Sequence, residues 1–575
     1  MQPRFLSRSL LLFLLLVASP CSPHEQDHAG AASALHESFL RCISDLSPGT
    51  ANPSHLVHAP SDPSYPSLLN STIQNLRFNS PETPRPALLL IPSTVAETQA
   101  CVACCRRHGL TVRARSGGHD YEGLSYRSVP SASSAAGARP FAVVDVALLR
   151  GVHVDLARRE ARVGAGATLG ELYYAAARDS GGALGFPAGI CPTVCAGGHL
   201  SGGGFGPMMR KHGLAADNVV GAEVVDAEGR LRLLPGRAAM GEGLFWAIRG
   251  GGGGSFGVVV SWTIRLVPVP PVVSAFTVRR RVRNRRQTEA TIRLLTAWQR
   301  VAQALPDDLF VKAALDSKLD VAGERRPMVT FKSLFLGNCS GMVALMSAHL
   351  PELGVTARDC RDMSWIESAL YFYGYTAGEP AEVLLDRTKQ PKDYYKVKLD
   401  YLTSPLPSAA VAGLLAWIAE DGGGSIDIDP QGGAMGAATP ESATPYAHRR
   451  GYLYNVQYFV KWRGGGGEEE GRHLAWVRGV HGFMAAYASS GPRASYVNFR
   501  DLDLGINVDG ETSYEKARGW GEMYFGGNFR RLAMVKAEVD PEQVFWSEQS
   551  IPPLFVAGAG EEWQSDQKSV FVSDS

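Results

Sequence analysis

Two glycine-crowded runs, each carrying a nucleophilic side chain, constrain this chain more than any other feature. The first run, residues 115–123, reads RSGGHDYEG and contains His119. The second, residues 191–206, reads CPTVCAGGHLSGGGFG and begins at Cys191. Glycine lets a backbone approach a ligand closely and adopt positive φ. A histidine and a cysteine among glycines therefore indicate a bulky bound cofactor rather than an ordinary packed core.

The spacing of the glycines and the absence of a P-loop motif limit the possible nucleotide-binding folds. Glycine-rich loops between strands and helices usually cradle phosphates with backbone N–H groups. Residues 164–170 read GAGATLG, which is one residue too long for GxGxxG, and they do not open the first βαβ unit. No GxxxxGK(S/T) motif occurs. A nicotinamide Rossmann enzyme and an ATPase are therefore disfavoured.

Charge and composition argue against several other classes of protein. The 575 residues include 57 basic and 56 acidic ones, and no basic block has the pattern of a nucleic-acid footprint. The short arginine cluster between Arg279 and Arg286 lacks interleaved aromatic residues and is expected to be a solvated face. No pair of CxxC motifs occurs, and no metal site is expected.

The N-terminus has the pattern of a signal peptide over residues 1–22. Two arginines precede the apolar run Leu10–Val17, and small residues and a proline follow it. The run is far below the ~20 residues of a membrane span, and no later segment is long and apolar enough. A secreted protein without a membrane span is predicted, with the extracellular space or cell wall as its location and the vacuole as an alternative. The sequons at Asn70 and Asn338 fit that route.

Nine cysteines are present, and Cys21 is expected to leave with the signal. The other eight are disulfide candidates in an oxidising compartment. A bridge between Cys42 and Cys104 is the first choice, with the remaining pairing left open.

The pattern of elements predicts an α+β fold. A β-α-β unit is expected first, with a strand at residues 87–91, a helix from the Thr94–Glu97 capping box to Gly109, and a strand at 111–115. Further elements are expected as strands at 141–146 and 152–163, a helix at 172–178, a hairpin at 219–234 and a strand at 258–266. From about residue 272, a helix at 291–305 and strands at 310–315 and 328–335 predict a second domain, with surface loops at 421–424 and 464–470.

Two long runs and the C-terminal stretch resemble one known family. Residues 113–126, residues 189–218 and the stretch from Trp520 to Pro552 resemble the berberine bridge enzyme-like family of plant flavoproteins. The resemblance implies a two-domain vanillyl-alcohol oxidase (PCMH-type) fold with a sheet-plus-helices substrate domain. It places the FAD-binding domain at 80–271, the substrate domain at 272–490 and a segment completing the FAD domain at 491–555. A disordered tail is expected at 556–575.

The same resemblance implies FAD bound through two covalent bonds, from His119 to the 8α-methyl group and from Cys191 to C6. Other residues expected at the cofactor are Arg115, Ser116, Gly117, Gly118, Gly197, Gly198, His199, Ser201 and Gly202. Cys195 departs from the family, which usually has glycine there, and it places a second sulfur close to Cys191. Val194 matches the position that gates oxygen access, where valine resembles the oxidase members.

The substrate wall is also implied by the resemblance. Tyr121 and Gln457 match residues that face the substrate, and Gln457 stands where the alkaloid-cyclising member has glutamate. Asn455 should point the same way as Gln457, because alternate residues of a strand share a face. Phe205 stands where some members have tyrosine.

Phe499 is the largest departure, because many members have an ionisable tyrosine or histidine at that position. Oxidising an alcohol requires removal of the O–H proton as hydride leaves, and a general base contributes about 10²–10⁴-fold. Tyr496, with Tyr121 second, is the expected base, and stacking against substrate is the alternative role for both.

These observations predict a secreted FAD-linked oxidase that acts on an alcohol or a sugar hemiacetal and reduces O₂ to H₂O₂. The alternatives are a dehydrogenase with another electron acceptor and a monolignol-type substrate, or a secreted flavoprotein of low turnover that serves in binding or storage. The protein is expected to be a monomer.

Overall fold

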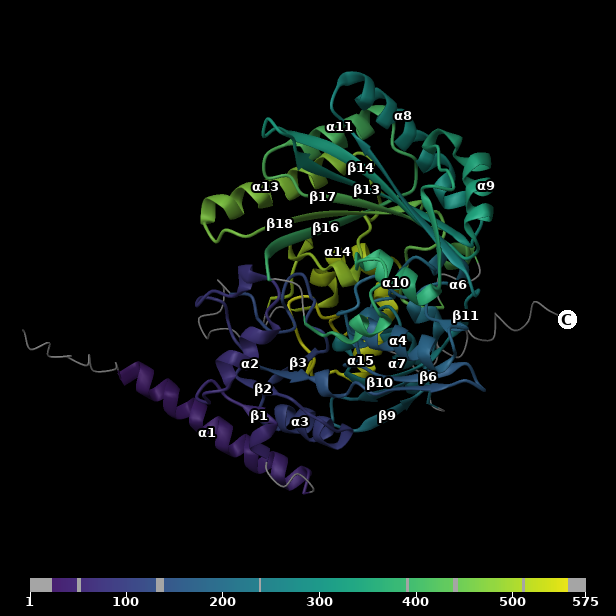
Figure 1. Ribbon diagram of the computed structural model, residues 1–575. Helices are drawn as coiled ribbons and strands as arrows, with labels where there is room; N and C mark the ends of the chain where they lie inside the picture. Colours follow the sequence, from purple (N-terminus) through teal and green to yellow (C-terminus); the bar gives the residue numbers. More distant parts are fainter. Residues whose placement is uncertain are drawn as a thin grey trace, which may run out of the picture.

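The computed structural model describes residues 23–48, 53–130, 139–236, 239–388, 392–437, 443–508 and 512–556. The predicted signal peptide, and all but the first residue of the predicted tail, lie outside these ranges. The molecule is built from a lower part, which contains most of the N-terminal elements, and an upper part formed by a large sheet with helices on its outer face (Figure 1). The combination of separate sheets and helices is an α+β fold.

The first sheet forms around the predicted β-α-β unit. β2 (Leu88–Leu90) leads through α3 (Val95–Arg107) to β3 (Thr111–Arg115), and both strands run parallel to β4 (Phe141–Asp145). β1 (Val57–His58) completes the order β1-β2-β4-β3. The capping box is present, because Thr94 Oγ1 accepts from Glu97 N while Glu97 accepts from Thr94 N. β3 ends where the RSGGHDYEG run begins, so this sheet fixes the position of that loop.

The second sheet has the order β5-β6-β10-β8-β9. The expected single strand at 152–163 is wrong: the chain turns between β5 (Val152–Asp155) and β6 (Glu160–Gly164), with Arg159 at a φ of 53°. The predicted hairpin is confirmed as β8 (Val219–Val225) and β9 (Leu231–Leu234), and β10 (Val258–Arg265) lies between β6 and β8. α4 (Leu169–Asp179) begins at the Thr168–Glu171 capping box and packs near this sheet.

The upper part is a seven-stranded antiparallel sheet of order β15-β12-β14-β13-β17-β18-β16. Its strands are β12 (Val273–Arg281), β13 (Leu309–Leu319), β14 (Arg325–Phe335), β15 (Cys360–Met363), β16 (Tyr394–Leu402), β17 (Ser425–Pro430) and β18 (Tyr454–Trp462). The helices α8 (Arg285–Val301), α11 (Ser408–Ala419) and α13 (Gly467–Met484) cover its outer face (Figure 1). Two predictions are corrected, because α8 begins six residues early, at the Asn284 N-cap, and α13 occupies part of the expected loop at 464–470.

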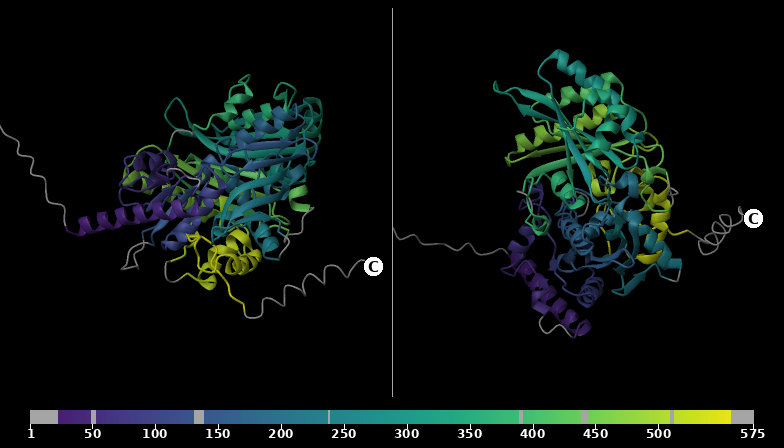
Figure 2. Two further views of the ribbon diagram at one scale, coloured as in Figure 1. Left: turned by 90° about the horizontal axis from the view of Figure 1, so that it is seen from below. Right: turned by 45° about the vertical axis from the view of Figure 1, so that its right-hand side comes forward.

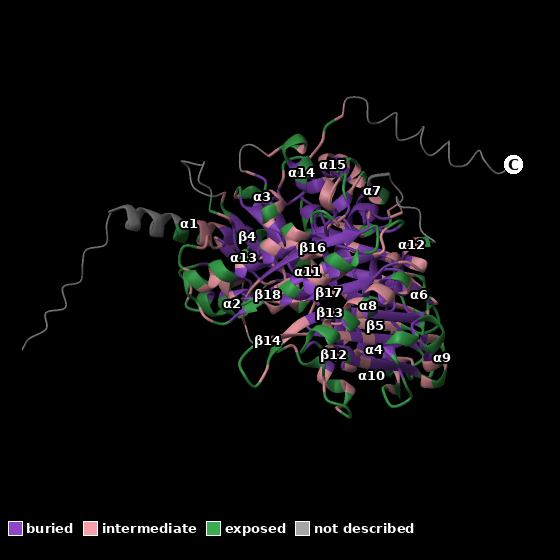
Figure 3. Cartoon of the chain, turned by 90° about the horizontal axis from the view of Figure 1, so that it is seen from above, coloured by how far each residue is buried: buried purple, intermediate pink, exposed green. Residues whose placement is uncertain are grey.

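Alternation along the central strand β17 separates two environments. Ile426 and Ile428 are buried in one hydrophobic core with residues of α8, α11 and α13. Because alternate side chains of a strand point to opposite faces, Asp427 and Asp429 face away from these helices. Most strand residues are buried in both parts (Figure 3).

The C-terminal segment returns to the lower part of the molecule. α14 (Tyr514–Phe525) and α15 (Asn528–Val539) follow the upper sheet, and α15 packs on α7 (Ala239–Ile248), next to the elements of the lower part (Figure 2). The chain then meets the first sheet, where Val112 N donates to Val544 O at 2.7 Å. Residues from the N-terminal and C-terminal regions therefore build the lower part together.

The described residues contain two disulfides and two exposed sequon asparagines. Cys42 in α1 (Pro23–Leu46) and Cys104 in α3 form a disulfide, the pair chosen from the sequence, and Cys339 pairs with Cys360. Asn70 and Asn338 are both exposed, and Asn338 caps α9 (Cys339–His349) by accepting from Gly341 N. Among the described residues, no helix has both the length and the apolar character needed to cross a bilayer.

Candidate active site

A cavity of about 520 Å³ brings the two glycine runs together. Its lining includes residues 115–121 after β3, most of residues 191–201, the glycine run at 252–255 and the C-terminal residues Trp546 and Ser547. His119 and Cys191, which are far apart in the sequence, both line it. The cavity also reaches Tyr395 and Phe459 of the upper sheet, so it extends from the lower part to the sheet.

Backbone geometry in the lining fits a bulky flat ligand. Gly118 has a φ of +67°, which residues with a side chain rarely adopt. A Cβ on Gly117 would lie 3.0 Å from Cys195 N, and one on Gly197 would lie 2.8 Å from Ser116 Oγ. At Gly198, in contrast, no atom lies within 4 Å of the Cβ position, so this backbone borders open space. The glycines let the two loops pack closely while leaving one side bare, which is the shape that an FAD cradle requires.

His119 is held in one orientation by the second loop. Its Nε2 lies 3.1 Å from the carbonyl oxygen of Thr193. A carbonyl can only accept, so Nε2 carries the proton in the neutral ring and Nδ1 is the nitrogen with a lone pair. The imidazole is therefore oriented with Nδ1 as its unprotonated nitrogen.

The two cysteines of the second loop differ in access. Cys191 is open to the cavity, although the surrounding protein raises the pKa of its thiol by burial, a shift that Lys312 opposes and Asp427 reinforces. Cys195 is only 3% exposed, and its Sγ lies 3.4 Å from Gly166 O. Of the two sulfurs, Cys191 is the one available to a ligand. Val194, between them, is partly buried and lines the same cavity.

The remaining predicted cofactor residues shape the cradle. Arg115 is fully buried and ion-pairs with Asp145 at 2.6 Å, which fixes the start of the first loop. His199 Nε2 accepts from Gly189 N at 3.0 Å, and burial lowers the pKa of this histidine to about 4, so the ring is neutral. Ser201 Oγ donates to Gly197 O. A Cβ on Gly202 would overlap the Asn498 side chain, which would have to move.

Four aromatic residues expected at the substrate form one box. The ring centroids of Tyr121 and Phe499 are 5.4 Å apart, those of Phe205 and Tyr496 are 5.3 Å apart, and Phe499 contacts Phe205 and Tyr496 as well. Most of these contacts are edge-on or tilted, as aromatic pairs prefer. The structure thus brings together Tyr121, Phe205, Tyr496 and Phe499 from three separate segments; we call them the aromatic box.

The two tyrosines of the box are poor proton acceptors. Burial raises the pKa of both hydroxyls well above the ordinary value. Tyr496 Oη accepts from Gly204 N and from Asn498 Nδ2, each at 2.9 Å, and these bonds do not overcome the burial. Burial therefore favours the protonated form of both phenols at physiological pH.

Gln457 and Asn455, the two amide residues of β18, differ in their side-chain hydrogen bonds. Gln457 Nε2 donates to Tyr121 Oη at 3.4 Å, which connects the sheet to the aromatic box. Asn455 is fully buried, and no described residue hydrogen-bonds either atom of its amide. In register, Asn455 lies opposite Asp429 and Tyr401 of the neighbouring strands.

Sequence reasoning missed an ion cluster on the cavity side of the upper sheet. Lys312 Nζ on β13 lies 2.9 Å from Asp427 Oδ1 and 3.3 Å from Asp429 Oδ1 on β17. We call these three residues the open cluster, because the Asp427 side chain keeps 28% of its surface exposed. The alternation Ile-Asp-Ile-Asp at 426–429 was the available signal, since two acidic residues in a buried strand need a partner.

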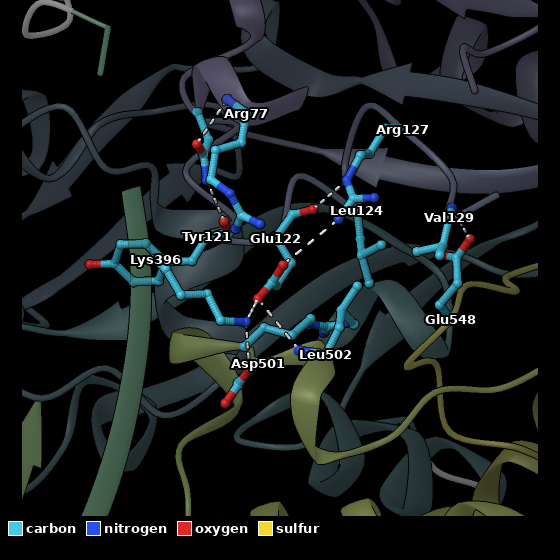
Figure 4. Close-up of polar contacts among 12 residues, drawn as sticks. Arg77, Tyr121, Glu122, Leu124, Arg127, Val129, Lys396, Asp501, Leu502 and Glu548 are labelled. Carbon is cyan, nitrogen blue, oxygen red and sulfur yellow. Dashed lines mark hydrogen bonds and ion pairs between the residues drawn. The ribbon is translucent and has the colours of Figure 1, made fainter. Parts of the chain in front are cut away.

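A second missed cluster joins three segments of the chain. Lys396 on β16 contacts Glu122 of the first glycine run, and its Nζ lies 2.6 Å from Asp501 Oδ1, just after Phe499 (Figure 4). We call Glu122, Lys396 and Asp501 the closed cluster, because each side chain is at most 5% exposed. Burial opposes the charge on Lys396, but its acidic partners outweigh that effect and raise its pKa. The cluster holds the loop carrying Tyr121 and the segment carrying Phe499 against the sheet.

Comparisons with known proteins agree with this geometry. Residues 86–234 match the model of an FAD binding domain, and residues 495–552 match the model described as berberine and berberine like. The chain is 44% identical to berberine bridge enzyme-like Cyn d 4 of Cynodon dactylon, over 95% of this chain and 99% of the relative. It is 41% identical to monolignol oxidoreductase AtBBE-like 13 of Arabidopsis thaliana, over 90% of this chain and 94% of the relative.

Solved structures show the same fold. Phl p 4, described as a grass pollen allergen with glucose dehydrogenase activity, superimposes with a TM-score of 0.82 at 41% identity, covering 90% of this chain and 100% of that chain. An isoleucine-to-valine variant of Phl p 4, with the same TM-score, identity and coverage, is described as a glucose oxidase.

Proposed function

Because the chain belongs to the berberine bridge enzyme-like family of FAD-dependent oxidoreductases, we propose that it oxidises a small alcohol or sugar hemiacetal with a flavin held by His119 and Cys191. The observation that carries the proposal is that His119, Cys191 and Tyr121 line a single cavity. Two potential anchors and a substrate-facing tyrosine therefore meet in one place. When bound, the flavin supplies the acceptor for hydride and passes the electrons to oxygen, which yields hydrogen peroxide.

The residues of the cradle bind and orient the cofactor. His119, fixed through Thr193, presents Nδ1, and Cys191 presents the more accessible sulfur. Arg115, Ser116 and the glycines of both runs keep the loops close together. Two attachment points hold the ring system rigidly, so that the substrate carbon and the ring meet in a fixed geometry.

The substrate lies against the aromatic box in this proposal. Aromatic faces exclude water and position the apolar side of a substrate. Tyr121 Oη and the amides of Gln457 and Asn455 offer hydrogen bonds to its hydroxyl groups, because Gln457 reaches Tyr121 and the Asn455 amide has unused bonding capacity among the described residues. This mixture of aromatic and neutral polar groups suits a hydroxyl-rich ligand, and the glucose activity named for Phl p 4 supports that class.

Oxygen is the electron acceptor in this proposal, and Val194 is the observation that favours it over another acceptor. Val194 lines the cavity directly between the two cysteines. In Phl p 4, the native protein is described as a glucose dehydrogenase and an isoleucine-to-valine variant as a glucose oxidase. A single aliphatic side chain can thus decide oxygen reactivity in this fold. The monolignol oxidoreductase relative keeps aromatic alcohols as the alternative substrate class.

We place the protein in the secretory route as a monomeric glycoprotein. The N-terminal signal pattern, the two disulfides and the exposed Asn70 and Asn338 support this placement. Disulfides persist in oxidising compartments. Endoglycosidase treatment of the purified protein should lower its mass, and light scattering should give the mass of one chain.

Anaerobic substrate screening tests the proposed reaction. Glucose, an oligosaccharide with a reducing end and cinnamyl alcohol are each mixed with the holoprotein, and the visible absorbance of the flavin is followed. Loss of absorbance, then rapid recovery with peroxide release on admitting air, is the expected result. Slow recovery in air indicates the dehydrogenase alternative, and no bleaching by any of the three supports the binding or storage alternative.

A further inference from the structure

The site lacks an obvious acceptor for the hydroxyl proton of the substrate. Phe499 has no ionisable group, and the neutral tyrosines of the aromatic box hold their protons because burial raises their pKa. Gln457 is an amide and cannot accept a proton at neutral pH. An anionic group must take this role if an alcohol is oxidised there. Of the carboxylates that line the cavity, Asp120 accepts from the backbone of its own loop and Asp393 pairs with Lys461, so we turn to the sheet face beside Gln457.

Asp427 is a carboxylate that the fold directs toward the substrate space. It lies on β17, which is paired on both sides, by β13 and β18, so no sheet edge exposes it. Its neighbours Ile426 and Ile428 are buried under the outer helices, so Asp427 projects from the opposite face. The 28% exposure of its side chain therefore opens to the space between the sheet and the lower part.

The partners of Asp427 place it beside the reacting groups. It lies directly opposite Gln457 in the antiparallel register, and residues so paired have Cβ atoms about 4.5–5.5 Å apart. Gln457 in turn donates to Tyr121 Oη. The charge of Asp427 also reaches the two groups across the cavity: burial is the main cause that raises the pKa of Tyr121 and of Cys191, and Asp427 adds to both.

We propose that Asp427 is the catalytic base that accepts the hydroxyl proton of the substrate, a role that rests on the proposed alcohol oxidation. A bound flavin would supply the acceptor for the hydride that leaves the substrate carbon, and the O–H proton passes to an Asp427 carboxylate oxygen. The C–O bond becomes a carbonyl, and the charges balance. Lys312, 2.9 Å away, is a positioning residue that stabilises the carboxylate before the transfer.

The second carboxylate of the open cluster is a matched control. Asp429 contacts the same lysine from the same strand face, but its side chain is 9% exposed and lies opposite Asn455 instead of Gln457. Burial raises the pKa of Asp429, with Asp427 adding to the shift and Lys312 opposing it. Asp429 is therefore enclosed where Asp427 is accessible.

Asp427→Asn and Asp429→Asn in the holoprotein test the assignment, with flavin reduction followed anaerobically by stopped flow. We expect Asp427→Asn to slow reduction by about 10²–10⁴-fold, and Asp429→Asn to cause a much smaller loss. Ionisable groups facing Asp427 are Lys312, Lys332, Asp316 and Asp429 on the sheet and Tyr121 and Cys191 opposite. The wild-type rate should fall at low pH as the base protonates, and this acid limb should vanish in Asp427→Asn.

Two further measurements separate catalysis from structure. Formate should restore part of the rate of Asp427→Ala, because a small carboxylate can enter the vacated space, and should not accelerate Asp429→Ala. Calorimetric binding of the matching deoxy analogue, which lacks the reacting hydroxyl, should be equal in wild type and Asp427→Asn. Weaker binding of that analogue together with no formate rescue would assign Asp427 a structural role and overturn the proposal.

These measurements test the assignment of Asp427 and the proposed function separately. Wild-type reduction by glucose or cinnamyl alcohol with an unchanged rate in Asp427→Asn overturns the base assignment and leaves the proposed function standing. Failure of every probe to reduce the wild-type flavin overturns the proposed function, and the assignment of Asp427 falls with it.

Discussion

The closed cluster and the open cluster each place a lysine between two carboxylates, in opposite surroundings, and Asp501 of the closed cluster also contacts Lys398 at 2.6 Å. The closed cluster lies on the edge strand β16 and joins three segments, with every side chain at most 5% exposed. The open cluster lies on the central strands β13 and β17, and Asp427 remains accessible. The closed cluster therefore stabilises the assembly of the site, whereas the open cluster offers a charge to a ligand.

The difference follows from the cost of burying charge. Removing one member of a fully buried ion pair leaves an uncompensated charge in a low dielectric. Removing the partner of a charge that water or substrate can reach costs less free energy of unfolding. Such a charge can also exchange a proton. Mutations in the closed cluster should therefore lower stability most, and mutations in the open cluster should slow catalysis most.

Lys396→Met should have the largest effect on stability. It removes the cation shared by the buried Glu122 and Asp501, which keep Arg127 at 3.7 Å and Lys398 at 2.6 Å respectively. Breaking a buried pair costs about 3–5 kcal/mol, and the remaining partners favour the lower end of that range. The free energy of unfolding from denaturant titration checks this value. A loss below about 1 kcal/mol would show that the closed cluster behaves like a surface ion pair and does not differ from the open cluster in its effect on stability.

Acid should lower the stability of the folded protein through the buried, neutral His448. His448 is 2% exposed, its Nε2 contacts Tyr524 O at 3.0 Å, and burial lowers its pKa from 6.5 to about 4. The unfolded chain therefore binds a proton before the folded one does. The stabilisation is complete above pH 6.5 and is lost as the pH falls toward 4, by up to about 3 kcal/mol. Unfolding measured against pH should show a flatter curve for His448→Gln than for wild type.

Lys312→Met should cost less stability than Lys396→Met, about 2 kcal/mol. Asp427 loses a charged hydrogen bond but can still reach water, and the enclosed Asp429, whose pKa burial raises, can take up a proton. The same variant should slow flavin reduction more than Lys396→Met does, relative to the stability lost. Thermal unfolding and stopped-flow reduction on one preparation give both quantities. Equal ratios for the two lysines would remove the distinction between the clusters.

Arg478→Ala should have the smallest effect. Arg478 pairs with Asp503 at 2.9 Å on the rim of the closed cluster, and its side chain is 52% exposed. Exposed pairs contribute about 0.2–1 kcal/mol. Denaturant titration should place this variant close to wild type, and a loss as large as that of Lys396→Met would extend the closed cluster to the surface.

Local patterns were sufficient to predict much of the lower part. The capping boxes at Thr94 and Thr168 involve residues three apart, and both are present. The resemblance to a known family supplied the aromatic box, whose members come from distant segments. The turn inside residues 152–163 was missed because both halves have strand-like composition, and only pairing of β5 with β6 distinguishes one strand from two.

Neither cluster could be predicted, because each depends on strand register and on contacts between distant segments. Lys312 meets Asp427 only because β13 pairs with β17 in one register, in which Ala314 lies opposite Asp427. A shift of one residue would turn both aspartates toward the helices. Lys396 meets Glu122 across 274 residues of sequence. The disulfide between Cys339 and Cys360 was also left open, since nothing in its local sequence selected that pair.

Mass spectrometry of the denatured, proteolysed holoprotein shows whether the flavin is attached twice. One flavin should join the peptide that contains His119 to the peptide that contains Cys191. Cys191→Ala should leave the flavin on the His119 peptide alone, and Cys195→Ala should leave both bonds intact. Release of free flavin on denaturation of the wild type, or survival of the second bond in Cys191→Ala, would rule out attachment through these two residues.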